Sequence, residues 1–124
     1  MHNPTDYEMI LAEAHGAAIT AVATASATYD EMRGACGFAW VTISGTEPLA
    51  RFCRAQLKAY DKAGVTNPRM RRQYGDKGYP KGWQFWNTGD HAGQRVDIKE
   101  AGAKAFRDTL AKYGIRADAG SRLD

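Results

Sequence analysis

The sequence predicts an α/β protein of the α+β type, with one small sheet of three to four strands packed against helices. Two observations support this prediction. Segments with a helical spacing of apolar residues alternate along the chain with short runs rich in Trp, Phe, Val and Ile. The chain has 124 residues, and single folded domains cluster near about 100 to 150 residues. We therefore expect residues 1–124 to form a single domain.

The first expected element is an N-terminal helix that begins near Thr5. Thr5 and Glu8 have the spacing of a capping box, in which each side chain accepts the other residue's backbone amide. Tyr7, Ile10 and Leu11 follow at helical spacing. The Thr and Val residues in the Ala-rich tract 17–28 weaken its helix propensity, so the sequence defines mainly the first half of the helix. The small side chains of the tract would let another element approach closely.

The clearest strand is the run CGFAWVTIS at residues 36–44. Phe38, Trp40 and Thr42 alternate with the apolar residues Ala39, Val41 and Ile43. A run that is apolar on both faces is typical of a central strand that is covered on two sides. We therefore expect helices or other elements on both faces of this strand.

A second helix is expected from Thr46 or Glu47 to Ala63. Thr46 is a suitable N-cap, and Pro48 would lie in the first turn, where its missing amide costs nothing. Gly64 has the position of a left-handed C-cap. Residues 66–82 then contain many Pro, Gly and Asn residues and predict a long loop. Loops of this length are usually functional or disordered.

The last third of the chain predicts two strands with a helix between them. Trp83, Phe85 and Trp86 form a short aromatic strand. Asp97 and Glu100 have capping-box spacing at the start of a helix that ends at Tyr113, with Gly114 after it. The alternation from Ile115 to Ala119 indicates a final strand.

This order of elements favours a ferredoxin-like, split βαβ arrangement. A fourth strand would lie in residues 29–35 or in the loop. Direct helical crossovers are expected to make neighbouring strands parallel.

The positive charge of the chain is concentrated in its middle. Residues 69–95 carry six Lys and Arg residues against two Asp residues, and aromatic residues lie between them. Cations pair with phosphates and exposed aromatic rings stack on bases, so this loop predicts a DNA or RNA interface. The candidate residues are Arg69, Arg71, Arg72, Tyr74, Lys77, Tyr79, Lys81, Trp86 and Arg95.

Two other classes of function stay open from the residues alone. A protein-binding modulator or inhibitor of host machinery, such as a defence system, would use the same aromatic and arginine side chains as contacts. An enzyme is less favoured, because common nucleotide-binding and hydrolase motifs are missing and only Cys36, His91 or His15, and Asp90 offer nucleophile, base and orienting group. Cys53 lies on the apolar face of its helix and predicts a buried, inert thiol.

Cofactors, metals and membranes are not expected. The three His and two Cys residues lack metal-ligand spacing. No apolar run approaches the roughly 18 residues of a membrane span, and no signal-like segment begins the chain. These features predict a cytoplasmic protein.

The segments CGFAWV, VDIKEAGAKAF with its YGI ending, and SRLD resemble a group of small proteins encoded by tailed bacteriophages. The resemblance covers residues 36–43 and about 89–124, and Leu123 departs from the Met found in the group. It implies a phage or prophage origin. No activity is assigned to the group, so the resemblance transfers no catalytic residue.

Overall fold

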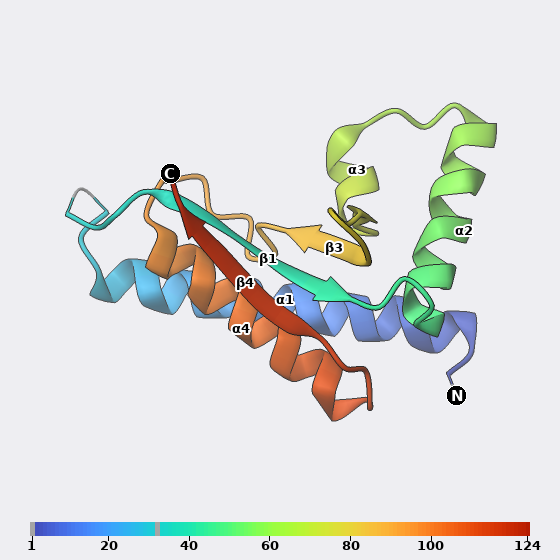
Figure 1. Ribbon diagram of the computed structural model, residues 1–124, viewed down its shortest axis with the longest axis horizontal. Helices are drawn as coiled ribbons and strands as arrows, with labels where there is room; N and C mark the ends of the chain where they lie inside the picture. The colour runs from blue at the N-terminus through green and yellow to red at the C-terminus, as the bar shows by residue number, and fades with distance from the viewer. Residues whose placement is uncertain (1, 32) are drawn as a thin grey trace.

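The chain folds as a four-stranded sheet with two long helices side by side on one face (Figure 1). The computed structural model describes residues 2–31 and 33–124. The predicted α+β class and N-terminal helix are confirmed. In chain order the elements are α1 (Pro4–Thr28), β1 (Gly37–Ile43), α2 (Pro48–Ala63), α3 (Pro68–Arg72), β2 (Asp76–Lys77), β3 (Trp83–Trp86), α4 (Val96–Lys112) and β4 (Asp118–Leu123).

The strand order is β2-β3-β1-β4, and every neighbouring pair is antiparallel. The crossover from β1 to β2 skips β3, and the crossover from β3 to β4 skips β1, which is the split βαβ arrangement. The expectation of parallel neighbours is therefore wrong: each crossover joins strands that run the same way but are not adjacent. The fourth strand is β2, inside the segment predicted as a loop, which also contains α3.

The core lies between the sheet and the layer of α1 and α4 (Figure 1). Phe106 of α4 is fully buried, and its ring centroid lies 5.0 Å from that of Phe85 on β3. The Ala-rich tract of α1 is helical to Thr28 and packs close to α4. A Cβ on Gly102 would lie 2.9 Å from Val22 Cγ2, so small residues at this contact permit the close approach.

The helix ends differ from the predictions in their caps. The N-cap of α1 is Asn3, which exchanges two hydrogen bonds with Asp6, and Pro4 occupies the first turn. The predicted Thr5–Glu8 box is wrong because Asn is an equally strong cap that starts the helix earlier. The cap of α2 is Glu47, since the Thr46 hydroxyl is hydrogen-bonded to Ser44. Gly64 and Gly114 are left-handed after their helices, as predicted.

The ends of α4 and the last strand also shift. Arg95 is the N-cap position of α4, and Asp97 pairs with the Arg95 guanidinium instead of closing a capping box with Glu100. The strand predicted over residues 115–119 lies at Asp118–Leu123, and Ile115 is buried beyond the end of α4.

By length and composition alone, α1 could cross a membrane, which amends the expectation that no segment reaches that length. One side of α1 is buried against α4 and the core residues of the sheet. Its buried residues are Tyr7, Ile10, Leu11, Ala14, Ala18, Val22 and Ala25.

Candidate functional site

One face of the sheet is not covered by α1 or α4. Ala39, Val41 and Ile43 of β1 are buried in the core, so the alternating residues of β1 point to the other face. The predicted cover on both sides of this strand is wrong, because α2 stands beyond the end of β1 and α3 lies beside β3, and neither lies across the sheet (Figure 1). The uncovered face carries three large rings, Phe38, Trp40 and Trp86, which we call the aromatic face.

The three rings of the aromatic face pack against one another. Trp40 and Trp86 are cross-strand partners with ring centroids 5.1 Å apart, and the centroid of Phe38 lies 6.1 Å from that of Trp86. The Trp86 indole donates a hydrogen bond to Gln84 Oε1 at 3.1 Å. Trp86 keeps 39% of its surface exposed. The rings therefore form one continuous apolar surface that remains accessible.

Two cations lie at the Phe38 end of the aromatic face. The guanidinium carbon of Arg122 on β4 is 5.4 Å from the Phe38 ring centroid. Lys99 of α4 is buried, donates to the carbonyl of Gly37 at 3.0 Å and has its Nζ 5.2 Å from the same ring. Lys99 therefore holds β1 in place, whereas Arg122 is exposed to solvent.

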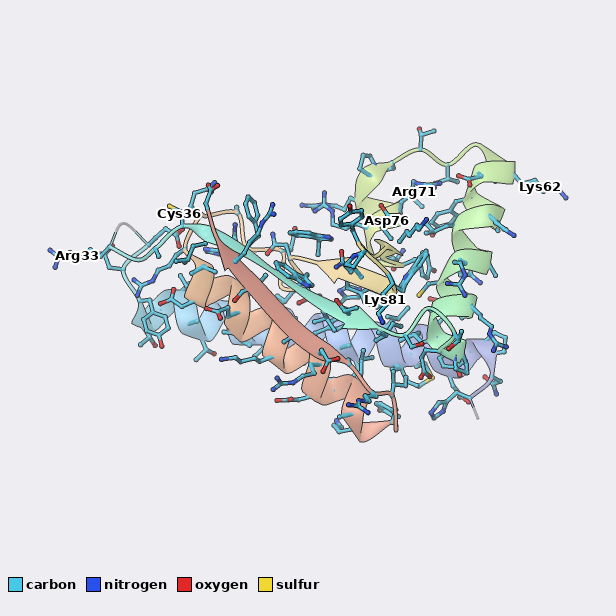
Figure 2. All side chains as sticks on the ribbon, in the orientation of Figure 1. Arg33, Cys36, Lys62, Arg71, Asp76 and Lys81 are labelled. Atoms are coloured by element: carbon cyan, nitrogen blue, oxygen red, sulfur yellow. The ribbon has the colours of Figure 1, made fainter. Side chains whose placement is uncertain are left out.

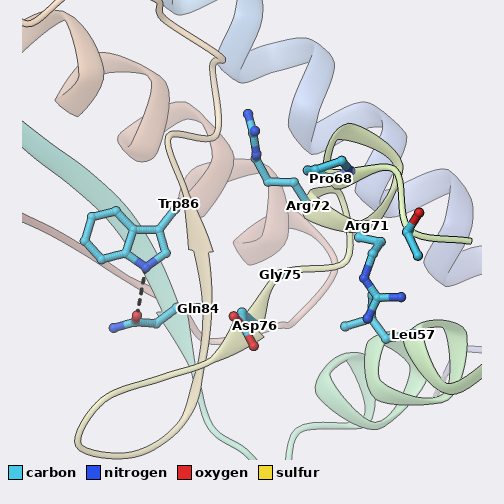
Figure 3. Close-up of a pocket in the computed structure, with 9 residues that line it drawn as sticks. Leu57, Pro68, Arg71, Arg72, Gly75, Asp76, Gln84 and Trp86 are labelled. Atoms are coloured by element: carbon cyan, nitrogen blue, oxygen red, sulfur yellow. Dashed lines mark hydrogen bonds between the residues drawn. The ribbon is translucent and has the colours of Figure 1, made fainter. Parts of the chain in front are cut away.

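A groove of about 480 Å³ separates Trp86 from α2 and α3. Figure 3 shows Trp86 and Gln84 of β3 on one side and Arg72, Arg71 and Leu57 on the other. Asp76 lies in the wall of the same groove, so the groove is not uniformly positive.

A second groove, of about 270 Å³, lies on the other side of Arg72 and Trp86, next to α1. Ile19 of α1 lines it together with Arg69 and Asp90. The Asp90 carboxylate is 3.4 Å from Arg69 Nη2 and 3.5 Å from Arg72 Nη1. Arg72 and Trp86 thus belong to both grooves. The structure brings together four of the predicted site residues, since Arg71 lines the first groove with them and Arg69 lines the second.

Three further predicted residues are exposed but lie on the β2–β3 hairpin. Tyr79 is 91% exposed in the connection between the two strands. Lys77 is exposed on the edge strand β2, and Lys81 lines a separate groove with Arg116. These side chains are accessible, yet none of them lines either groove beside Trp86.

Tyr74 and Arg71 have structural contacts that sequence reasoning missed. Tyr74 is only 5% exposed and donates its hydroxyl proton to Glu8 Oε1 at 2.7 Å, so it is a core residue. Burial, together with the Glu8 carboxylate, raises the pKa of Tyr74 well above its usual range. Arg71 is 2.8 Å from the Asp61 carboxylate and donates to the carbonyl of Val65, which fastens α3 to α2.

Arg95 is separated from the other predicted residues. It forms an isolated β-bridge with Cys36, and Figure 2 shows Cys36 at the opposite end of the molecule from Arg71, Asp76 and Lys81. Its guanidinium is paired with Asp97 at 2.6 Å and stacks on Tyr29. Asp97 raises the pKa of Arg95, and Arg95 in turn lowers the pKa of Asp97. Arg95 therefore organises the start of α4.

The residues missed by sequence reasoning are Phe38, Trp40 and Arg122. Their face could be identified only once the register of β1 with β3 and β4 was known, because Phe38 and Trp40 are as apolar as the core residues between them. The signal available in the sequence was the size difference between the two faces. The covered face has Ala39, Val41 and Ile43, which suit a closely packed helix.

The residues considered for catalysis differ in burial and make separate contacts. Cys53 is buried, and burial raises the pKa of its thiol to about 12. Cys36, the candidate nucleophile, is exposed and has a free thiol. His91 Nε2 lies 2.8 Å from the Glu31 carboxylate, while Asp90 faces the arginines of α3. Across residues 2–31 and 33–124, no cluster of His, Cys, Asp and Glu could hold a metal ion.

No family model, no curated protein and no solved structure matches the chain.

Proposed function

We propose that the protein binds single-stranded nucleic acid on the aromatic face. The observation that carries this proposal is the group of three accessible rings on two central strands with Arg72 beside them. Stacking of a base on an aromatic ring is worth about 1 to 3 kcal/mol and does not depend on sequence. Arginines supply the phosphate contacts.

A single strand fits this face better than a duplex. The bases of a duplex are stacked on each other, whereas a single strand can lay its base planes on protein rings. Arg72 lies at the Trp86 end of the face and Arg122 at the Phe38 end. Asp76 and Asp118 flank the face at Gln84 and Thr42. The backbone is therefore expected to run from Arg72 past Trp86 toward Arg122, away from these carboxylates.

The test is fluorescence anisotropy with labelled DNA and RNA strands of about 12 nucleotides, a length that suits one small domain. Trp86→Ala should weaken binding about tenfold, because it removes the most exposed stacking ring. Tyr79→Ala is the matched control, since Tyr79 is an exposed aromatic residue outside both grooves. Equal losses in the two variants would contradict a site on the sheet, and no binding by the unmodified protein at low salt would end the proposal.

The salt dependence of binding distinguishes this function from a protein-binding role. Phosphate contacts release counterions, so nucleic-acid binding should weaken steeply as salt rises. A protein interface built on the same rings should change little. The resemblance to tailed-phage proteins supports, within the same proposal, an accessory role in the cytoplasm of an infected host.

A further inference from the structure

Asp90 stands between the two arginines that line the groove next to Trp86. Each carboxylate oxygen faces one guanidinium, Oδ2 toward Arg69 at 3.4 Å and Oδ1 toward Arg72 at 3.5 Å. These distances are long for hydrogen bonds between charged groups. All three side chains are at least half exposed. Exposed pairs of this kind contribute little to folding stability and break easily.

The backbone holds Asp90 in this position without help from the arginines. Asp90 has a positive φ of 54°, and its amide donates to the carbonyl of Asn87 at 2.8 Å. The Asn87 side chain donates to the carbonyl of His91 and accepts its amide. The turn 87–91 is therefore closed by its own hydrogen bonds. The Asp90 carboxylate can rotate away from the arginines while this turn stays in place.

We propose that the Asp90 carboxylate occupies the position of a nucleic-acid phosphate, and that a phosphate of the bound strand displaces it from Arg69 and Arg72. This inference rests on the proposed function. A phosphodiester offers the same arrangement of oxygens to the guanidinium groups as a carboxylate does. Its binding also releases counterions from the strand, which the internal carboxylate cannot do.

The position of the phosphate follows from the groove. Arg72 lines both grooves beside Trp86, and Arg69 and Asp90 line the one next to α1. A strand whose base stacks on Trp86 has its adjoining phosphate within reach of Arg72. Asp90 then acts as an internal competitor that lowers the affinity for isolated anions and favours a ligand held at the same time by stacking.

The test compares Asp90→Asn with the unmodified protein in anisotropy titrations with oligo(dT) and oligo(U) at several salt concentrations. Asn adopts positive φ readily, so the turn is retained. Binding should tighten about 3- to 10-fold at low salt, and the slope of log affinity against log salt should become steeper by about 0.7 per phosphate gained. Asp108→Asn on the opposite side of the sheet is the control for net charge.

The outcomes separate the two proposals. A gain in Asp90→Asn that disappears in Asp90→Asn/Arg72→Ala supports displacement of the carboxylate. Binding by the unmodified protein with equal effects of Asp90→Asn and Asp108→Asn overturns displacement and leaves the proposed function intact. No binding by either the unmodified protein or Asp90→Asn overturns both. Binding only after the substitution also overturns both, because a phosphate of the strand then fails to displace the carboxylate in the unmodified protein.

Discussion

Trp40 on β1 stands directly opposite Gly120 on β4, and its indole ring occupies the space that a side chain at Gly120 would fill. A Cβ built on Gly120 would come within 2.8 Å of Trp40 Cε2 and Nε1. The ring can lie over β4 only because this position has no side chain. The arrangement of the aromatic face therefore depends on the absence of a side chain at Gly120.

We expect Gly120→Ala to displace the Trp40 ring. The substitution should change the near-ultraviolet circular dichroism of the Trp residues and weaken binding of single-stranded nucleic acid by about fivefold, within the energy of one stacked base. Gly16→Ala on α1 is the matched control, because a Cβ at Gly16 meets nothing within 4 Å. It should leave binding unchanged and stabilise the helix. An unchanged Trp spectrum in Gly120→Ala would contradict the packing inferred here.

The sequence predicted the helices and strands better than it predicted how they pack against one another. Alternation along residues 36–44 identified which side chains share a face, and that grouping is correct. It could not indicate that only one face is covered, since this depends on the direction that α2 takes after β1. The helix α2 extends away from the sheet, and α1 takes the place beside α4 (Figure 1). Phe38 and Trp40 consequently belong to a surface and not to a second core.

The candidate site was predicted in part for the same reason. The charge excess in residues 69–95 drew attention to Arg69, Arg72 and Trp86, which line one groove in the structure. Composition could not separate these residues from Tyr74, whose ring is buried among core aromatics. Nor could it reveal that Arg95 lies at the other end of the molecule. Both distinctions depend on tertiary packing.

Arg71 and Arg72 are neighbours with different expected roles. Arg72→Ala should weaken binding of oligo(dT) about 3- to 10-fold and flatten its salt dependence, because a phosphate contact is lost. Arg71→Ala should mainly lower the free energy of unfolding, by about 1 kcal/mol, since it removes the contacts of α3 with Asp61 and Val65. Arg51→Ala, an exposed arginine of α2, is the control for charge.

Salt titrations and urea denaturation of the three arginine variants would check these roles. The triple variant of Arg69, Arg71 and Arg72 should combine both losses. If Arg51→Ala and Arg72→Ala weaken binding equally, the effect is one of net charge, and the assignment of Arg72 to a phosphate contact is wrong.

The two cysteines should differ in reactivity. Cys36 is exposed, whereas the thiol of Cys53 is buried with its pKa raised to about 12. At pH 8 a thiol reagent should therefore modify one cysteine rapidly in the native protein and the second only after unfolding, because the thiolate is the reactive form. Cys36→Ser removes the fast phase and identifies it. A fast phase that persists in Cys36→Ser would contradict the burial of Cys53.

Glu31 should make the stability of the fold depend on pH. Its carboxylate accepts the amide of Arg95 at 2.9 Å and that of Gln94 at 2.6 Å, and it lies 2.8 Å from His91 Nε2. The backbone hydrogen bond from Arg95, followed by the contacts with His91 and Gln94, lowers the pKa of Glu31 below its ordinary value of 4.5. The charged form is therefore favoured in the folded state.

Because the pKa of Glu31 is lowered in the folded state, its charged form stabilises the fold at a pH above the ordinary pKa. This stabilisation is lost as the pH falls through the lowered pKa of the folded state. Glu31→Gln should consequently unfold at a lower urea concentration than the unmodified protein at pH 7, and the difference should shrink below about pH 4.5. Glu47→Gln is the control, because the Glu47 side chain makes no capping hydrogen bond. Urea midpoints measured from pH 7 to pH 3 test the prediction, and a difference that grows as the pH falls would refute it.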